Sequence, residues 1–267
     1  MSSSPPVVLA FAASDPTGGA GLQADLLTLA SLGCHPLSVL TGLTVQDTRG
    51  VESLLAIEAA WVERQARRVL EDIPVAAFKL GVLGSAGNAR VIAAILAEHP
   101  RIPVVLDPVL ASGRGDALAD DETTQILRSA LLPRTSVLTP NSLEARRLAG
   151  AAPDADLREC AHELAKLGCK YVLVTGTHEK GAEVVNTLYN AHGVVREDRW
   201  QRLPGSYHGS GCTLASALAA LLARGMDLEA AVLEAQRYTW HTLAAAFSPG
   251  KGQHLPDRFF AVREKAP

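Results

Sequence analysis

The chain has 267 residues, of which 48% are hydrophobic and 20% are charged, and this composition is that of an ordinary globular protein with a large core. Its formal net charge of -3 excludes the strongly basic surface of a typical nucleic-acid-binding protein, and no apolar run is long enough to cross a bilayer. We therefore expect one domain over residues 1–267 that binds a small molecule, with no nucleic-acid or membrane partner.

The amino terminus and the cysteines both indicate a protein of the cytoplasm. The opening residues, MSSSPP, are polar and lack the positively charged start of a secretory signal. The cysteines form no CxxC pair, which argues against a structural zinc site and against a disulfide framework. They are Cys34, Cys160, Cys169 and Cys212.

Short apolar runs alternate with amphipathic segments along most of the chain. The runs predict strands at residues 7–13, 37–45, 76–82, 103–106, 136–138 and 170–174. The segments between them predict helices at residues 22–32, 59–70, 86–98, 121–131 and 157–167. This alternation favours an α/β fold, in which helices cover both faces of a parallel sheet.

The pattern changes after the last of these strands. Residues 182–203 alternate between apolar and polar and contain a turn at 190–193, which predicts antiparallel edge strands. A small-residue helix follows Gly211, and its apolar character all round predicts packing on several sides. A final long helix is expected from Asp227 to Ala246, with Asp227 as its N-cap.

A glycine turn opens the small-residue helix and is the strongest candidate for an anion site. Gly209 and Gly211 lack a Cβ, so the backbone can direct successive N–H groups toward one point at the positive end of the helix. A phosphate would suit such a turn. The alternative is a glycine-rich start to a buried helix with no ligand. The chain contains no GxxxxGK[ST] motif, so a P-loop is excluded.

A second glycine turn, SDPTGGAGLQAD, follows the first predicted strand. Residues 19–24 formally match the dinucleotide fingerprint GxGxxA, which keeps an NAD(P)-dependent oxidoreductase of the Rossmann type as an alternative. The match is weak because residues 14–18 make a longer turn than the Rossmann one. Packing of glycines at a helix start would also explain the pattern.

Polar residues after two later strands suggest a metal site. Asp107 precedes Pro108 and could reach a metal-bound phosphate, although Asp before Pro also begins turns. Asn141 and Glu144 lie three residues apart, so they could share a helix face and address a hydrated Mg²⁺. They could equally form a capping box at a helix N terminus.

Three stretches, taken together and in this order, resemble the ribokinase superfamily and, within it, the hydroxymethylpyrimidine and phosphomethylpyrimidine kinases. They are SDPTGGAGLQADLLTLASLG, TPNSLEA and YHGSGCTLASALAA. The resemblance implies a ribokinase-like three-layer α/β/α sandwich with antiparallel edge strands. It also implies a homodimer that uses ATP and Mg²⁺ to phosphorylate 4-amino-5-hydroxymethyl-2-methylpyrimidine and its monophosphate in thiamine biosynthesis.

The same resemblance assigns roles to individual residues. Cys212 stands where most ribokinase relatives carry a catalytic Asp, and a thiol inside a helix N terminus is expected to be favoured as the thiolate. The anion hole would comprise Gly209, Ser210 and Gly211 together with Cys212. The remaining assignments are Asp25, Gln46, Gly21 and His208 for the substrate, Asn141, Thr175 and Lys251 for the nucleotide, and Asp107 and Glu144 for the metal.

One residue departs from the pyrimidine kinase pattern. Thr175 stands in VLVTGTH where those enzymes usually carry Lys, so a cationic phosphate contact is missing. Either a neighbour such as Lys180 replaces it, or hydroxyl and backbone contacts suffice. A vitamin B6 kinase and a catalytically silent pyrimidine-binding protein remain as alternative functions.

Overall fold

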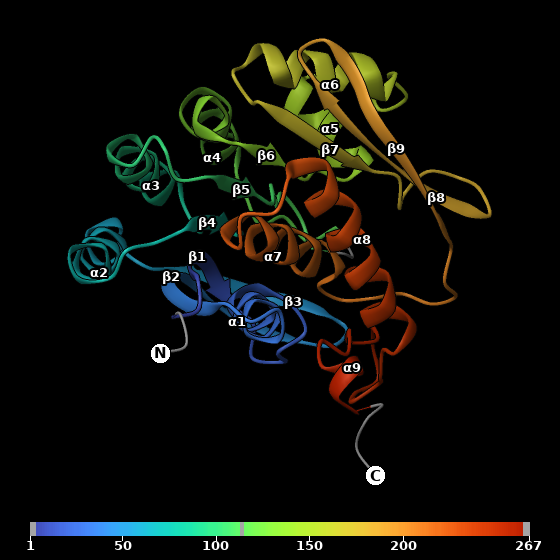
Figure 1. The fold of residues 1–267 in the computed structure, drawn as a ribbon, viewed down its shortest axis with the longest axis horizontal. Coiled ribbons are helices and arrows are strands. Elements are labelled where there is room, and N and C mark those ends of the chain that lie inside the picture. Colours follow the sequence, from blue (N-terminus) through green and yellow to red (C-terminus); the bar gives the residue numbers. More distant parts are fainter. Residues whose placement is uncertain (1–3, 113–114, 264–267) are drawn as a thin grey trace.

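A computed structural model describes residues 4–112 and 115–263, and the three opening residues on which the expected location partly rests lie outside this range. Nine strands form one sheet in the order β3-β2-β1-β4-β5-β6-β7-β8-β9 (Figure 1). The six from β2 to β7 in this order are parallel, as the alternation predicts. They are β2 (His35–Asp47), β1 (Val7–Ser14), β4 (Ala77–Leu80), β5 (Val104–Leu106), β6 (Val137–Leu138) and β7 (Tyr171–Thr175).

Antiparallel strands complete both edges of the sheet. β8 (Glu183–Asn190) and β9 (Gly193–Gln201) form the expected hairpin beside β7. At the other edge, β3 (Gly50–Ala56) pairs with β2, and this strand was not predicted. The polar residues before it form a tight turn in which Asp47 Oδ1 accepts a hydrogen bond from Arg49 N.

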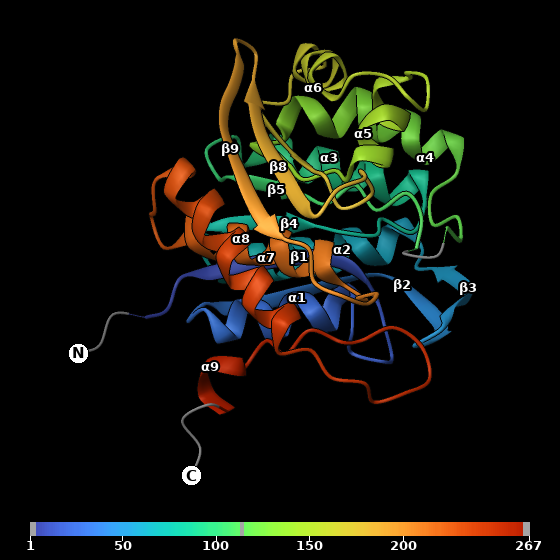
Figure 2. The same cartoon turned by 90° about the vertical axis from the view of Figure 1, so that its right-hand side faces the viewer.

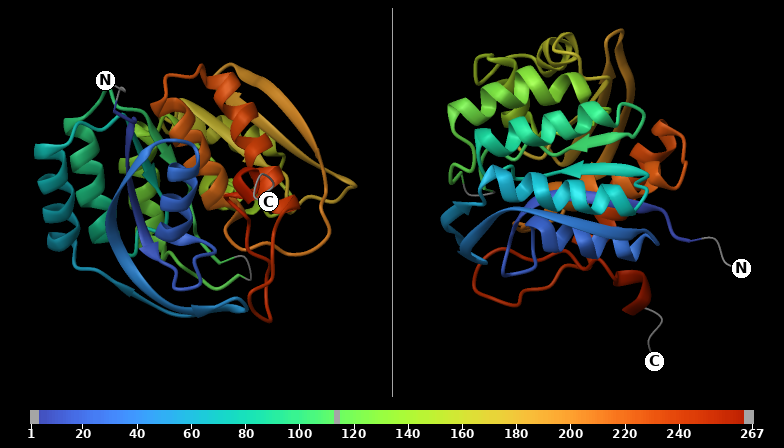
Figure 3. Two further views of the ribbon diagram at one scale, coloured as in Figure 1. Left: turned by 60° about the horizontal axis from the view of Figure 1, so that its bottom comes forward. Right: turned by 90° about the vertical axis from the view of Figure 1, so that its left-hand side faces the viewer.

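Helices cover both faces of the sheet, which makes the predicted three-layer sandwich. One face carries α1 (Gly21–Ser31), α7 (Ser210–Ala223) and α8 (Leu228–Ala244), as Figures 1 and 2 show. The other carries a row of helices seen face-on in the right-hand view of Figure 3. These are α2 (Ala59–Asp72), α3 (Ala86–Glu98), α4 (Asp121–Ile126), α5 (Ser142–Ala149) and α6 (Leu157–Lys166).

The central strand shows why the apolar runs mark buried parallel strands. Along β1, Leu9 and Phe11 pack into the core beneath α2 and α3, while Val8, Ala10 and Ala12 pack beneath α1 and α7. All five side chains are fully buried. A strand covered on both faces has no polar side to alternate with, so its sequence is continuously apolar.

One predicted helix needs correction, and one short helix was not predicted. The helix expected over residues 121–131 is α-helical only to Ile126, then widens into a π-helical turn, Leu127–Leu131, and ends in a 3₁₀ turn, Leu132–Arg134. Pro133 lies in that last turn, where it cannot continue the ladder of backbone hydrogen bonds. A short helix, α9 (Phe260–Arg263), was not predicted. The N-cap of the last long helix is confirmed, because Asp227 accepts from Glu229 N and Ala230 N.

Candidate active site

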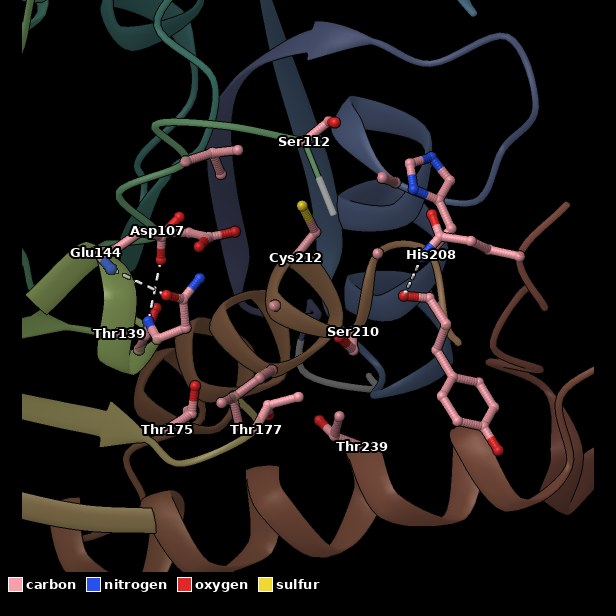
Figure 4. Close-up of a pocket in the computed structure, with 18 of the residues that line it drawn as sticks. Asp107, Ser112, Thr139, Glu144, Thr175, Thr177, His208, Ser210, Cys212 and Thr239 are labelled. Carbon is pink, nitrogen blue, oxygen red and sulfur yellow. Dashed lines mark hydrogen bonds between the residues drawn. The ribbon is translucent and has the colours of Figure 1, made fainter. Parts of the chain in front are cut away.

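A cavity of about 810 Å³ opens at the carboxyl ends of the parallel strands. Loops after β1, β5 and β6 supply part of its wall, and the start of α7 forms another part. In Figure 4, Asp107 and Glu144 lie on one side of the cavity, Ser210 and Cys212 lie in the middle, and His208 lies on the other side. The fold therefore brings three separate polar segments to one place, as expected for a parallel sheet.

The start of α7 has the geometry of an anion site. Gly209 is the N-cap with φ +80°, and no side chain of the described residues caps this helix end. The first-turn N–H groups of an α-helix have no partner within the helix, so those of Ser210, Gly211 and Cys212 can bind a ligand in the cavity. A Cβ at Gly209 would overlap the carbonyl oxygen of Gly19. The two glycine turns thus touch through their backbones.

Cys212 is not a favoured thiolate, and that prediction is wrong. Burial raises the pKa of its thiol well above the ordinary value, more than nearby Lys79 lowers it, and the charges of Asp107 and Asp25 raise it further. The Asp107 carboxylate and the Gly21 amide both lie close enough to the Cys212 thiol to affect its titration or be affected by it. The helix N terminus is outweighed because the sulfur is enclosed by protein beside two carboxylates. Cys212 is therefore a protonated thiol in the cavity wall.

Asp107 and Glu144 form a pair of poorly solvated carboxylates. Burial raises the pKa of Asp107 to about 6, with Asp25 adding to the rise and Lys79 opposing it. Burial and the charge of Asp107 raise the pKa of Glu144 to about 8. Oδ2 of Asp107 is buried and has no hydrogen-bond partner among the described residues. A bound cation would stabilise the charged forms of both carboxylates.

The donor set fits a hydrated Mg²⁺ but not a metal held by protein alone. No group of three or more His, Cys, Asp or Glu side chains with metal-binding geometry occurs in the described part of the chain. Mg²⁺ commonly takes one or two carboxylates, several waters and phosphate oxygens, so Asp107 and Glu144 suffice when a phosphate is present.

Asn141 and Glu144 form the capping box that was one of the two expectations. Oδ1 of Asn141 accepts from Glu144 N at 2.9 Å, and Oε2 of Glu144 accepts from Asn141 N at 3.0 Å. Both residues nevertheless line the cavity, as does Thr175, whose N–H donates to Pro140 O at 2.9 Å. The capping box fixes the direction of the Glu144 side chain, so the structural and functional interpretations are compatible.

Asp25 does not line the cavity, contrary to its predicted contact with the substrate. It is fully buried, with Oδ1 2.7 Å and Oδ2 2.8 Å from Lys79 Nζ. Oδ1 also accepts from Ser216 Oγ at 2.8 Å. Its place on α1 turns it toward α7 and β4 rather than toward the cavity. The sequence does not predict this ion pair, because Lys79 lies within the apolar strand β4, far from Asp25 along the chain.

The other predicted substrate residues do line the cavity, and Asp15 joins them. Gly21, Gln46 and His208 are all in the wall. His208 Nε2 lies 2.9 Å from Asp15 Oδ2. Burial alone would raise the pKa of Asp15, but hydrogen bonds from His208 and the Ala20 amide lower it to about 2. Asp15 belongs to the predicted glycine turn, but no local pattern indicates its role.

Lys251 is exposed and does not line the cavity. Its loop instead lies against the β2–β3 turn, where Gln253 N donates to Thr48 O at 2.8 Å, as the left-hand view of Figure 3 illustrates. Arg147, which was not predicted, does line the cavity one helical turn beyond Glu144. Its Nη2 lies 3.8 Å from Asp121 Oδ1.

Part of the cavity wall is aromatic. Trp200 and Trp240 line it together with Gln236 and Thr239. Trp200 Nε1 donates to Gln236 Oε1 at 3.0 Å, and Trp240 Nε1 donates to Gln201 O at 3.0 Å, so both indoles are fixed. Fixed aromatic faces beside polar groups suit a planar heterocycle. The tryptophans come from β9 and α8, and only the fold brings them together.

Comparisons with known proteins point to one family. Residues 15–257 match the family model described as phosphomethylpyrimidine kinase. The chain is 40% identical to a hydroxymethylpyrimidine/phosphomethylpyrimidine kinase of Streptomyces coelicolor, over 97% of each chain. It is also 40% identical to a thiamine biosynthesis bifunctional protein of Geobacter sulfurreducens, of which it spans only 53%.

Solved structures agree with this fold. A phosphomethylpyrimidine kinase of Clostridium difficile is 33% identical with a TM-score of 0.76, covering 88% of this chain and 97% of that one. An ADP complex of Bacillus subtilis pyridoxal kinase is 27% identical with a TM-score of 0.86, covering 98% and 100%. Among the described residues, no helix is both long and apolar enough to span a membrane.

Proposed function

Because this chain belongs to the phosphomethylpyrimidine kinase family, we propose that it transfers the γ-phosphate of ATP to 4-amino-5-hydroxymethyl-2-methylpyrimidine and then to the monophosphate, in thiamine biosynthesis. The observation that carries this proposal is the amide turn of Gly209 to Cys212, which lines one cavity together with the carboxylates of Asp107 and Glu144. Amides that bind a phosphoryl group and carboxylates that bind a divalent cation are the parts that phosphoryl transfer needs.

Each end of the cavity suits one substrate. The indoles of Trp200 and Trp240 would hold the adenine, with Asn141 and Thr175 along the path of the phosphates. Gln46 and the Asp15–His208 pair would bind the aminopyrimidine at the other end, because an amide side chain offers both a donor and an acceptor. The hydroxymethyl group would then face the amide turn.

Asp107 and Glu144 would hold Mg²⁺, which neutralises the charge of the nucleotide phosphates when bound. The Gly211 and Cys212 amides would stabilise the charge on the transferred phosphoryl oxygens. As a protonated thiol, Cys212 cannot simply accept the proton of the attacking hydroxyl. We propose a relay, in which the hydroxyl proton passes to sulfur while the S–H proton passes to the neighbouring Asp107 carboxylate.

The relatives favour one second candidate, a pyridoxal kinase, because the Bacillus subtilis enzyme of that name matches almost the whole chain. An assay that couples ADP release to a colour change would compare the pyrimidine, its monophosphate and pyridoxal at equal concentrations. We expect turnover of both pyrimidines. Turnover of pyridoxal alone would favour the second candidate, whereas tight NAD(P) binding without ADP release would favour an oxidoreductase.

The homodimer, the cytoplasmic location and the single domain over residues 1–267 remain part of this proposal. Light scattering of the purified protein would test the dimer, with twice the chain mass as the expected result. Limited proteolysis would test the single domain, because a single cooperative unit should resist cleavage between its elements.

A further inference from the structure

A buried arginine of the C-terminal segment, Arg258, contacts both glycine turns of the candidate active site from the protein side. Arg258 is only 4% exposed and does not line the cavity, so it would not touch either substrate. A buried guanidinium is costly unless its donors are used, and here they are used on two different parts of the site.

The contacts of Arg258 join the first glycine turn to α7. Nη2 donates to Gly19 O at 2.6 Å and Nη1 donates to Gly18 O at 3.2 Å. Nη2 and Nε also donate to Thr213 Oγ1, at 3.0 and 3.2 Å. Thr213 in turn donates from Oγ1 to Gly209 O at 2.8 Å. One side chain therefore fixes the distance between the turn on the substrate side and the turn on the phosphate side.

The first glycine turn is closely packed against its neighbours. Gly19 has no space for a Cβ, which would lie 2.6 Å from the His208 ring and 2.5 Å from Leu255 Cδ2. Two residues after Gly19, Gly21 lines the same cavity wall as Cys212, and its amide lies near the thiol. A shift of the first turn would therefore move Gly21 relative to Cys212, and a misplacement of about 1 Å can reduce a reaction rate about 100-fold.

We propose that Arg258 is a positioning residue for phosphoryl transfer, which sets the register of the two glycine turns through its forked contacts to Gly18, Gly19 and Thr213. Its positive charge also lies behind the amide turn, close enough to interact with Cys212. Arginine suits this position better than lysine because a planar fork can address two carbonyls and a hydroxyl at once.

The segment that carries Arg258 is anchored independently of its guanidinium. Tyr238 Oη donates to Arg258 O at 2.9 Å and lies 2.6 Å from Ser31 Oγ. Asp257 N donates to Thr242 O at 2.9 Å. These bonds allow a matched test, because Tyr238→Phe loosens the anchor and leaves the fork intact.

The inference rests on the proposed kinase activity, so wild-type turnover of the pyrimidine is measured first; if it is absent, the proposed function fails rather than the role of Arg258. Arg258→Ala, Arg258→Lys, Tyr238→Phe and Arg263→Ala are then compared per mole of folded protein. Arg263 lies on the same segment with its side chain 65% exposed, so its variant should match the wild type.

We expect Arg258→Ala to lower kcat about 100-fold while KM for the pyrimidine changes less than threefold, because the turns remain but lose their register. Arg258→Lys should stay at least 10-fold impaired. Millimolar guanidinium chloride should raise kcat of Arg258→Ala several-fold and leave the Arg263→Ala control unchanged. The proposal is overturned if Arg258→Ala keeps its kcat, if Lys replaces Arg fully, if guanidinium gives no rescue, or if Tyr238→Phe at the same melting temperature loses as much kcat.

Discussion

Lys79 and Asp25 form an ion pair with no solvent exposure, 2.7 Å apart between Nζ and Oδ1, beneath the wall of the candidate active site. Removing one member would strand a buried charge, whereas replacing both would not. We expect Lys79→Met to lower the free energy of unfolding by about 3–5 kcal/mol, and Lys79→Met with Asp25→Leu to lower it less. Urea denaturation checks this, and a double variant less stable than the single one would contradict it.

Kinetics of an Asp25 variant can distinguish a direct substrate contact from a structural role in the ion pair with Lys79. A direct contact with the pyrimidine would make Asp25→Asn raise KM for that substrate. The buried pair with Lys79 instead predicts lower stability with KM changed less than about twofold. Steady-state kinetics with the pyrimidine as the varied substrate distinguishes them, and Gln46→Ala, at a position in the cavity wall, is the matched variant expected to raise KM.

The protonated state of Cys212 can be tested by chemical modification. Because burial raises the pKa of its thiol, iodoacetamide should alkylate Cys212 far more slowly at pH 7 than it alkylates glutathione, and the rate should still be rising above pH 9. Peptide mass spectrometry would follow Cys212 itself, with the other three cysteines, all buried, as internal controls. Rapid alkylation at pH 7 would restore the thiolate interpretation.

The raised pKa values of Asp107 and Glu144 predict a specific pH dependence of stability. The folded protein binds more protons than the unfolded chain between the ordinary carboxyl range and about pH 8, so stability should fall as pH rises through this window. Thermal melting from pH 5 to pH 8.5 checks the sign. Glu144→Gln, which can retain the hydrogen bond to Asn141 N, should flatten the dependence.

The same carboxylates predict that Mg²⁺ binding strengthens with pH. The cation competes with protons for both groups, so the stabilisation by Mg²⁺ with ADP should grow from pH 6 to pH 8 and be small in Asp107→Asn. A stabilisation that is equal at both pH values would argue against these ligands.

Arg147 is our candidate for the cationic phosphate contact that is missing because Thr175 stands where related kinases usually carry Lys. Arg202 also lines the cavity, but its guanidinium donates to the carbonyls of Thr177, Glu179 and Gly181. The Arg147 side chain is 43% exposed, and its one ion pair among the residues that the structure describes is a long contact to Asp121. We expect Arg147→Ala to raise KM for MgATP about 10-fold, the value of one charge-assisted contact. Arg134→Ala, outside the cavity wall, is the control, and equal KM values in the two variants would contradict this assignment.

Local sequence signals predicted most of the fold. The apolar runs predicted the parallel strands because a strand buried on both faces must be apolar throughout, as β1 is. Strand β3 was not predicted because its residues are partly exposed and form no continuous apolar run. The strand forms by pairing with β2. The change to a π-helical turn after Ile126 has no signal that we recognise in the sequence.

The sequence predicted those parts of the candidate site that lie in a recognisable local motif. The segments around Gly209 and Asn141 were found because glycine and capping patterns have local physical causes. Whether a side chain faces the cavity is decided by the fold, which is why Asp25 was assigned to the substrate and Arg147 was missed. The pKa of Cys212 also depends on burial, which no local pattern reports.

The most direct test of the central claim is a single-turnover reaction of the wild-type protein with MgATP and 4-amino-5-hydroxymethyl-2-methylpyrimidine, with products identified by mass spectrometry. The proposed function predicts ADP together with the pyrimidine monophosphate, followed by the diphosphate. ADP formation with pyridoxal alone, or no phosphorylated pyrimidine in the presence of bound nucleotide, would contradict it.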